Sequence, residues 1–243
     1  MKLVFIADAH ANLPALEAVV RLIQKEGYDL LFHLGDAIAI GPHPREALEL
    51  LLSLKDVRFV IGNHDDWYVN GLPQPRPAWM SEGEVEHQLW THAQLGDDFK
   101  PMLSKWPRKI THEIDEIKLA CLHYALTEDG NDFKPILRDP LPSDLDDHFD
   151  LNADLVLFGH THLEGDLQGR SRYITPDSLG CQKFSVAPYT LIEIKNGEIA
   201  VQYRRVPYES DSLFDEFENR GVPEREFIYK VFFGGRFPPY LRK

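Results

Sequence analysis

The segment Lys2-Leu-Val-Phe-Ile-Ala7, followed directly by Asp8-Ala-His10, decides the fold of this chain. Its first six residues form a short apolar run, which is typical of a β-strand buried on both faces. Asn12 can cap a helix that has Pro14 in its first turn, and apolar residues then recur at helical spacing up to Gly27. A strand, a polar turn and an amphipathic helix in this order predict the beginning of a parallel α/β sheet.

The same alternation continues along the chain. Residues 28–34 and 57–61 are predicted strands, and residues 44–54 between them are a predicted helix. Two strand–helix–strand units at this pitch indicate a parallel sheet. Regular strands return at 117–122 and 154–158. Strands at 189–195 and 198–206 are predicted to pair as a hairpin, because Asn196-Gly197 between them is the strongest short-range signal for a tight β-turn.

Residues 66–107 differ in amino-acid composition from the rest of the chain. They hold all four tryptophans and a series of prolines, with one helical stretch at 82–95. We expect an inserted lid or cap segment over one face of the sheet. Its tryptophans either stack on a nucleobase or aryl group of a substrate or pack into a satellite core, and we favour the core.

The C-terminal tail, residues 209–243, begins acidic and then becomes helical. The predicted helix runs from Pro223 to Phe233 and carries Phe227, Ile228 and Val231 on one side. We expect this helix to pack on the body of the protein; a contact in a homo-oligomer is the alternative. Hydrophobic residues make up 43% of the 243 residues, enough for one substantial core, so we expect a single domain over residues 1–243.

Charge and cysteine content narrow the possible partners. The formal net charge of −13 disfavours bulk DNA or RNA. It leaves an anionic small substrate open, because a bound metal can reverse the local field. The two cysteines, Cys121 and Cys181, form no Cys-x-x-Cys motif, and neither a secretory signal nor an 18-residue apolar span is apparent. We expect a reduced cytoplasmic protein that does not enter a membrane.

Polar residues follow each of five predicted strands. Asp8 to Asp36 is 28 residues and Asp36 to Asn63 is 27, about one strand–helix–strand unit each, so these side chains should return to neighbouring positions on one sheet edge. The candidates are Asp8-Ala-His10, Gly35-Asp36, Gly62-Asn-His-Asp65, His123 and Gly159-His-Thr-His162.

The residue types in this set favour divalent metal ions. Imidazole, carboxylate and amide oxygen suit Mn, Fe, Zn, Co or Ni, and the absence of thiolate argues against a structural zinc site. Seven ligands suit two ions, which Asp36 could bridge. These candidate ligands are Asp8, His10, Asp36, Asn63, His123, His160 and His162. Taken singly, an Asp after a strand is usually a turn or cap residue, and His33 is best interpreted as a structural histidine. The appearance of all five motifs in order, each after a predicted strand, favours a metal-binding site.

Other hydrolytic sites are weaker candidates. A Cys121–His123 nucleophile is conceivable because the two side chains point to the same side of a strand, but a buried structural thiol is favoured. No Gly-x-Ser-x-Gly elbow is present. A binuclear amidohydrolase would need eight strand–helix units, for which the chain is short.

The motifs Asp8-x-His10, Gly35-Asp36, Gly62-Asn-His-Asp65, His123 and Gly159-His-x-His162 resemble the signature of the calcineurin-like metallophosphoesterases, in order and spacing from residue 1 to about 206. The resemblance is to the small single-domain prokaryotic phosphodiesterase and phosphatase branch. It implies an α/β, four-layer αββα sandwich of two mixed β-sheets flanked by helices, and a dinuclear centre.

The resemblance also implies roles for individual residues. Asp8, His10 and His162 would hold one ion, Asn63, His123 and His160 the other, and Asp36 would bridge. His64 would act as general acid or transition-state stabiliser, with Asp65 orienting its ring. Mn is the expected metal, with Fe, Ni, Co and Zn as alternatives.

These roles predict hydrolysis of phosphate esters by a hydroxide that bridges the ions. The substrate would be a small phosphorylated compound or a nucleotide. Its identity is open because several residues depart from the family pattern, among them Tyr124-Ala125 and Thr175-Pro-Asp-Ser178. The alternative is a metal-bearing binding or regulatory protein of the same fold with little or no turnover.

Overall fold

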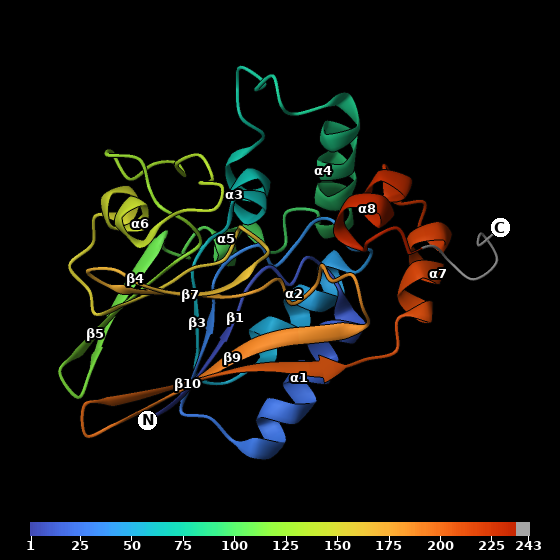
Figure 1. The fold of residues 1–243 in the computed structure, drawn as a ribbon. Helices are drawn as coiled ribbons and strands as arrows, with labels where there is room; N and C mark the ends of the chain where they lie inside the picture. The colour runs from blue at the N-terminus through green and yellow to red at the C-terminus, as the bar shows by residue number, and fades with distance from the viewer. Residues whose placement is uncertain (237–243) are drawn as a thin grey trace.

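The computed structural model describes residues 1–236 and contains two five-stranded sheets (Figure 1). The first sheet has the order β10-β9-β1-β2-β3 and the second the order β4-β5-β6-β8-β7. The strands of the first sheet are β1 (Lys2–Ile6), β2 (Leu30–His33), β3 (Val57–Phe59), β9 (Val186–Lys195) and β10 (Glu198–Pro207). Those of the second are β4 (Lys109–Ile114), β5 (Ile117–Leu122), β6 (Leu155–Leu157), β7 (Glu164–Gln168) and β8 (Arg172–Pro176).

Both sheets are mixed and share a similar plan. In the first, β1, β2 and β3 are parallel, and β9 runs antiparallel to both β1 and β10. In the second, β5, β6 and β8 are parallel, and β4 and β7 are antiparallel edge strands. Each sheet therefore has three neighbouring parallel strands whose carboxyl ends point in one direction.

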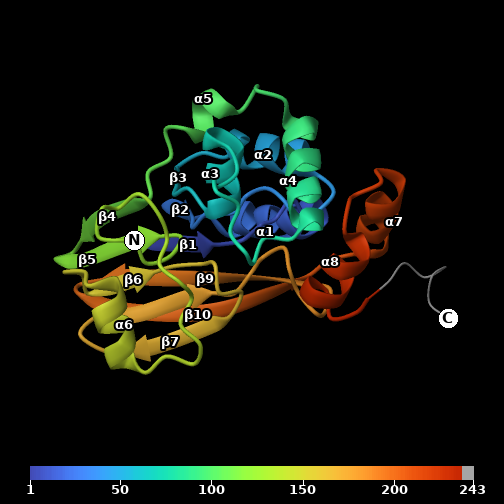
Figure 2. The same ribbon diagram turned by 90° about the horizontal axis from the view of Figure 1, so that it is seen from above.

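Helices cover the outer faces of the two sheets, as Figure 2 shows. On the side of the first sheet lie α1 (Leu13–Glu26), α2 (Pro44–Ser53), α3 (Asn63–Asn70), α4 (Glu82–Leu95) and α5 (Lys100–Leu103). The helix α6 (Pro142–Phe149) covers the second sheet, and the C-terminal helices are α7 (Asp211–Asn219) and α8 (Arg225–Phe232). The predicted four-layer αββα sandwich of two mixed sheets is confirmed.

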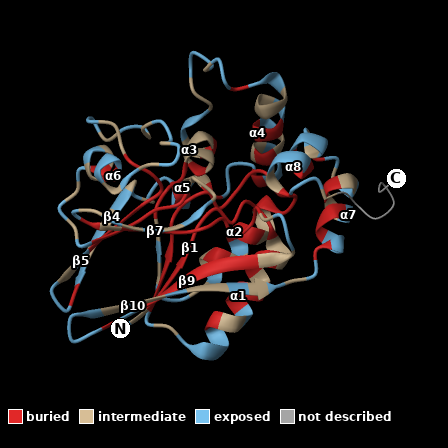
Figure 3. Ribbon diagram, viewed as in Figure 1, coloured by how far each residue is buried: buried red, intermediate tan, exposed pale blue. Residues whose placement is uncertain are grey.

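The central strand β1 is buried on both faces, as its apolar sequence predicts. Leu3 and Phe5 belong to the core between the sheets, whereas Val4 and Ile6 belong to the core under α1 and α2. All four side chains are at most 1% exposed. Each such burial stabilises the fold by about 1.5–3 kcal/mol. The buried strands stand out in Figure 3 against the exposed outer surfaces of the helices.

Segment 66–107 packs closely on the first sheet. Its first residues continue α3, which begins at Asn63, and Tyr68, Leu95 and Leu103 join the core under α1 and α2. Trp106 stacks on Phe59 with ring centroids 4.5 Å apart. This packing accords with the favoured core interpretation for part of the segment; its role as a lid stays a prediction.

The C-terminal tail differs from the expectation for its apolar side. The predicted helix 223–233 is observed as α8, but Phe227 and Val231 are 52% and 53% exposed, while Ile228 and Tyr229 are buried against α7. Of the three residues predicted to lie on one side of this helix, only Ile228 packs on the body, whereas Phe227 and Val231 are largely exposed. The part of the predicted tail beyond residue 236 lies outside the described residues.

Some elements were not predicted at all, namely the helices α3, α5, α6 and α7 and the strands β4, β7 and β8. The edge strands β4 and β7 alternate between exposed and half-buried residues, and α6 is short and rich in aspartate. Among the described residues, no helix combines the length and the apolar character that crossing a bilayer requires.

Candidate metal centre

The seven predicted ligands lie at one edge of the sandwich, just beyond the carboxyl ends of parallel strands from both sheets. Asp8 and His10 follow β1, Asp36 follows β2, and Asn63 opens α3 after β3. From the second sheet, His123 follows β5, and His160 and His162 follow β6. Parallel strands share this edge, so residues far apart in sequence, such as His10 and His162, come into contact there.

One half of the cluster centres on His123. Its Nε2 lies 3.2 Å from Asp36 Oδ2, 3.1 Å from His160 Nδ1 and 3.1 Å from Asn63 Oδ1. Asn63 Oδ1 is also 3.3 Å from Asp36 Oδ2 and 3.0 Å from His160 Nδ1. Turning the Asn63 amide would place its NH₂ group among these acceptors. A cation at this point would instead satisfy Asp36, Asn63, His123 and His160 in their present orientation. Asp36, His123 and His160 have the mutual spacing of metal ligands.

The other half centres on His10. Its Nε2 lies 2.9 Å from His162 Nε2 and 3.9 Å from Asp36 Oδ2. His162 Nε2 is 3.7 Å from Asp8 Oδ1. Asp36 Oδ2 therefore faces both halves, which is the position that a bridging carboxylate requires.

Backbone carbonyls orient two of the imidazoles. His10 Nδ1 lies 3.2 Å from the carbonyl oxygen of Ile38, and His123 Nδ1 lies 2.8 Å from that of Leu34. A carbonyl only accepts, so each Nδ1 carries the proton and donates it. Each Nε2 is left to face the cluster, which is the arrangement that metal-binding histidines usually adopt.

Burial and charge set the protonation of the histidines. Burial, followed by the neighbouring imidazole of His162, lowers the pKa of His10 well below its usual range. Burial and His123 lower the pKa of His160 to about 3, and burial lowers that of His162 to about 4. These three rings are neutral near pH 7 and can donate lone pairs to a cation.

His123 and Asp36 form a charged pair. Burial by itself lowers the pKa of His123, but Asp36 and then Asp8 raise it, to about 9. Burial by itself raises the pKa of Asp36, but His123 and then His64 bring it well below its usual range. In the protein without metal, the His123 proton thus occupies part of the space that a cation would take.

The backbone at the site is held in an uncommon conformation. Five of the seven candidate ligands have positive φ, and such residues concentrate at functional sites. They are Asp8, His10, Asp36, His160 and His162, with φ between 44° and 66°. Gly62 is needed for the close approach of these loops, because a Cβ there would lie 2.1 Å from Asp36 Oδ1. The loops are therefore shaped for the convergence of these side chains.

Asp65 does not orient the ring of His64, contrary to the prediction. Asp65 Oδ2 accepts hydrogen bonds from the backbone amides of Asp36 and Gly62, and Oδ1 accepts one from Ala37. The carboxylate is fully buried and ties the start of α3 to the loop after β2. Asp65 thus holds Asp36 in place through the backbone.

Gln88 on α4 contacts His64 instead. Its Nε2 lies 2.7 Å from His64 Nδ1 and donates to Glu84 Oε1 at 2.8 Å. Both hydrogens of the amide are used, so His64 Nδ1 accepts and the ring proton sits on Nε2, which lies 3.9 Å from Asp36 Oδ2. Sequence reasoning missed Gln88, because nothing in a helix sequence indicates which side chain 24 residues away it will meet.

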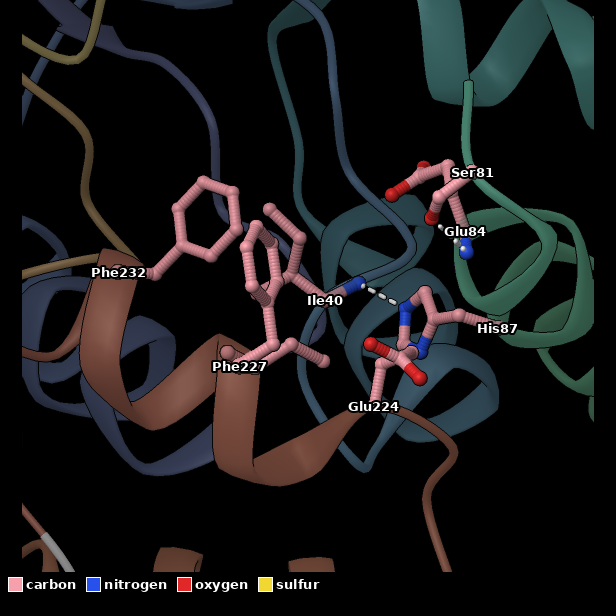
Figure 4. A pocket seen from close by; sticks show the side chains of 8 residues that line it. Ile40, Ser81, Glu84, His87, Glu224, Phe227 and Phe232 are labelled. Atoms are coloured by element: carbon pink, nitrogen blue, oxygen red, sulfur yellow. Dashed lines mark hydrogen bonds between the residues drawn. The ribbon is translucent and has the colours of Figure 1, made fainter. Parts of the chain in front are cut away.

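A cleft of about 360 Å³ opens over the cluster, a size that suits a small substrate. Besides candidate ligands and His64, it is lined by Ile40, Thr161, Val231 and Phe232. Ile40 and Phe232 also line a neighbouring cavity between α4 and α8. Figure 4 shows the apolar side chains of Ile40, Phe227 and Phe232 in that cavity, with His87 and Glu224 beside them. The C-terminal helix therefore forms one wall of the cleft.

The donor set fits divalent cations, since four imidazoles, two carboxylates and an amide oxygen converge at one edge of the sandwich. His33, which we interpreted as structural, is fully buried behind the site and accepts from the backbone amide of Gly35. Cys121 lies fully buried in the core between the sheets, as expected for a structural thiol.

Comparison with known proteins agrees with this architecture. The model of the calcineurin-like phosphoesterase superfamily domain matches residues 1–197. The chain is 27% identical to protein MJ0912 of Methanocaldococcus jannaschii, with 90% of this chain and 93% of the relative covered. It is 28% identical to phosphodiesterase YfcE of Escherichia coli K12, over 75% of this chain and 82% of the relative. The crystal structure of a metallophosphoesterase from Sphaerobacter thermophilus has the same fold, with a TM-score of 0.69, 24% identity, and 92% of this chain and 96% of that chain covered.

Proposed function

This chain belongs to the calcineurin-like phosphoesterase superfamily, and from that membership we propose that it hydrolyses phosphate esters at a dinuclear metal centre. The family is metal-dependent, and the chain has groups of histidine and aspartate that could hold a metal. The proposal assigns Asp8, His10 and His162 to one ion and Asn63, His123 and His160 to the other, with Asp36 between them.

The observation that carries the proposal is the position of Asp36 Oδ2, 3.2 Å from His123 Nε2 and 3.9 Å from His10 Nε2. One carboxylate oxygen thus faces two separate sets of nitrogen and oxygen donors. A single tetrahedral ion would use only four of the seven candidate ligands. Two ions use all of them.

When bound, two divalent ions hold phosphate oxygens, reduce the repulsion of an attacking oxygen and lower the pKa of a shared water. The protein's own contribution on the leaving-group side is His64. Its Nε2–H faces the cluster, and its Nδ1 is held by Gln88. We propose that this N–H donates to the leaving oxygen as negative charge develops there.

The surroundings of the cleft favour a phosphodiester with an apolar or aromatic leaving group. Phe232 lies beside the cluster, with its ring centroid 5.8 Å from that of His162, and Val231 and Ile40 complete an apolar wall. The relative in E. coli is named a phosphodiesterase, which agrees with this choice. A diester also carries only one negative charge, which suits a site with two carboxylates.

A metal and substrate panel tests the proposal. Protein treated with chelator is reloaded separately with Mn²⁺, Co²⁺, Ni²⁺, Fe²⁺ or Zn²⁺ and incubated with bis(4-nitrophenyl) phosphate and with 4-nitrophenyl phosphate. We expect metal-dependent release of nitrophenol, fastest from the diester, with Mn²⁺ among the activating ions. Protein that holds two ions per chain but hydrolyses neither ester, nor any phosphorylated metabolite of a broad panel, would instead be a metal-bearing binding protein.

A further inference from the structure

Cys181 lies beside the candidate metal centre, although its position in the sequence does not indicate this. It follows β8, in a loop that packs beneath the end of β1. Leu179 N donates to Ala7 O at 2.9 Å, Gly180 N donates to Asp8 O at 3.0 Å, and a Cβ on Gly180 would lie 2.0 Å from Ala9 O. The loop is therefore pinned against the segment that carries Asp8 and His10.

The sulfur of Cys181 forms a compact group with two of the candidate ligands. The sulfur, a ring nitrogen of His10 and a ring nitrogen of His162 all lie within 4.8 Å of one another. Ligands that share one tetrahedral ion at about 2.0–2.3 Å lie about 3.3–3.8 Å apart. The separations among the three atoms, at most 4.8 Å, exceed this spacing by no more than about 1.5 Å, on the side of the cluster that also holds Asp8.

Two features argue for more than apolar packing at this position. The Nε2 atoms of His10 and His162 face each other at 2.9 Å, and the His10 Nε2 cannot donate, because its ring proton is held by the Ile38 carbonyl. The other cysteine, Cys121, is fully buried between the two sheets and belongs to no group of potential ligands among the described residues. The two cysteines therefore differ in surroundings despite similar burial.

We propose that Cys181 is a thiolate ligand of the ion that His10 and His162 hold, and that it makes this half of the centre select Zn²⁺, Co²⁺ or Fe²⁺ over Mn²⁺. On binding, a sulfur–metal bond replaces the S–H bond, the proton passes to solvent, and no electron is transferred. Thiolate favours these softer ions, whereas Mn²⁺ prefers oxygen ligands. The inference rests on the proposed metal centre and adds a ligand that its seven members do not include.

The thiolate has a consequence for the substrate. It removes one positive charge from the centre, which weakens the attraction for a doubly charged phosphate monoester more than for a singly charged diester. The sulfur is also largely shielded from solvent, since Cys181 is only 7% exposed and belongs to the apolar cluster that includes residues of α7 and α8.

Cobalt spectroscopy tests the inference without substrate. Metal-free wild type, Cys181→Ser and Cys121→Ser are each titrated with Co²⁺, and the near-ultraviolet sulfur-to-cobalt charge-transfer absorption is followed. We expect this absorption in wild type and in Cys121→Ser and its loss in Cys181→Ser. In competition between Zn²⁺ and Mn²⁺ read by metal analysis, Cys181→Ser should shift the preference toward Mn²⁺ by at least about tenfold.

Several outcomes are decisive. A wild-type protein that binds Co²⁺ without the absorption overturns the inference, as does a Cys181→Ser protein that keeps it. If Cys181→Ser fails to fold, Cys181→Ala replaces it. The absorption should then be present in wild type and in Cys121→Ser and absent in Cys181→Ala. Wild type that shows the absorption but hydrolyses no ester contradicts the proposed function alone. Wild type that hydrolyses the diester without the absorption contradicts this inference alone.

Discussion

At the scale of single residues, the chemistry depends on which nitrogen of each imidazole is free. His10 and His123 each donate a hydrogen bond from Nδ1 to a backbone carbonyl, so their Nε2 atoms face the cluster. The Nε2 of His10 offers a lone pair there, and that of His123 does so once its second proton has left. His64 is held the other way, with Nδ1 accepting from Gln88 and the proton on Nε2. The first two rings therefore suit a cation, whereas the third suits a developing negative charge.

This distinction predicts a rate effect without metal loss for His64→Ala. The variant should keep the metal content of wild type, because His64 is outside the proposed ligand set. Its turnover of an aryl phosphodiester should fall by at least about 100-fold, the usual scale for general acid–base assistance. Metal analysis and kcat on the same preparation provide the measurement, and wild-type turnover in a metal-replete variant would contradict the role.

Asp65→Ala should affect stability first. It removes the acceptor of three buried backbone N–H groups, at 2.8, 3.0 and 3.1 Å. We expect the free energy of unfolding to fall by about 3 kcal/mol or more. Asp66→Ala is the matched control, since it breaks a partly exposed ion pair with Arg108 and should cost less than about 1 kcal/mol. Denaturant unfolding measures both; unchanged stability in Asp65→Ala would contradict the role of this carboxylate in holding the loop after β2.

The charged pair of His123 and Asp36 predicts how metal binding depends on pH. The pKa of His123 is raised to about 9, so the metal-free protein holds this proton at pH 7, whereas a metal-bound imidazole does not. Metal binding should therefore release at least one proton, and affinity should rise by at least about tenfold per pH unit until pH approaches 9. Calorimetry in two buffers of different ionisation enthalpy counts the protons; binding without proton release at pH 7 would contradict this assignment.

At the scale of elements, the strand ends deliver the candidate ligands and α4 completes the site. His87 on α4 accepts from the backbone amide of Ile40 at 2.7 Å, and Ile40 has a φ of 62°, which is uncommon for a β-branched residue. One turn of the same helix thus braces the loop after β2 and holds His64 through Gln88. The segment that we predicted as an insertion contributes directly to the geometry of the cleft.

Gln88→Leu should therefore lower catalysis and leave the metals in place. Leucine fills a similar volume but cannot fix the ring of His64, so we expect kcat to fall about tenfold with metal content unchanged. Leu89→Ala on the exposed side of the same helix, where Leu89 is 55% exposed, should keep wild-type kcat. Steady-state kinetics on both variants is the measurement. Equal kcat values would show that Gln88 does not position His64.

At the scale of the whole molecule, two sheets with inward apolar faces place their strand ends at one edge, and the cluster there joins them. The acceptors of this cluster face one another at 2.9–3.3 Å, so they repel unless a proton or cation lies between them. Metal ions at this edge would therefore link the first sheet to the second.

Chelation should accordingly lower thermal stability. A ligand at 1,000 times its Kd stabilises the native state by about 4 kcal/mol. For a chain of this length each kcal/mol corresponds to about 2–4 °C. We expect the unfolding temperature to fall by about 10 °C on removal of metal and to return when Mn²⁺ or Zn²⁺ is added back. Identical unfolding temperatures with and without metal would contradict a cation at the junction of the sheets.

The sequence by itself determined which residues could be ligands and that they would meet. Apolar runs such as Leu3 to Ile6 encode strands through their own burial, and parallel strands share one edge, so Asp8, Asp36 and Asn63 had to converge. These are consequences of chain direction and local periodicity. The pattern indicated a parallel sheet, and the four-layer fold was implied by the resemblance of the motifs to one family.

Only the tertiary structure decided which other side chains contact the candidate ligands and His64. Gln88 contacts His64, Asp65 binds backbone amides, and Cys181 approaches His10, and in each case the sequences of the two segments do not indicate the contact. The exposed position of Phe227 is likewise not indicated by the sequence of its helix. The physical reason is that hydrophobic periodicity fixes which face of an element turns inward, whereas the neighbour on that face depends on how all the layers pack together.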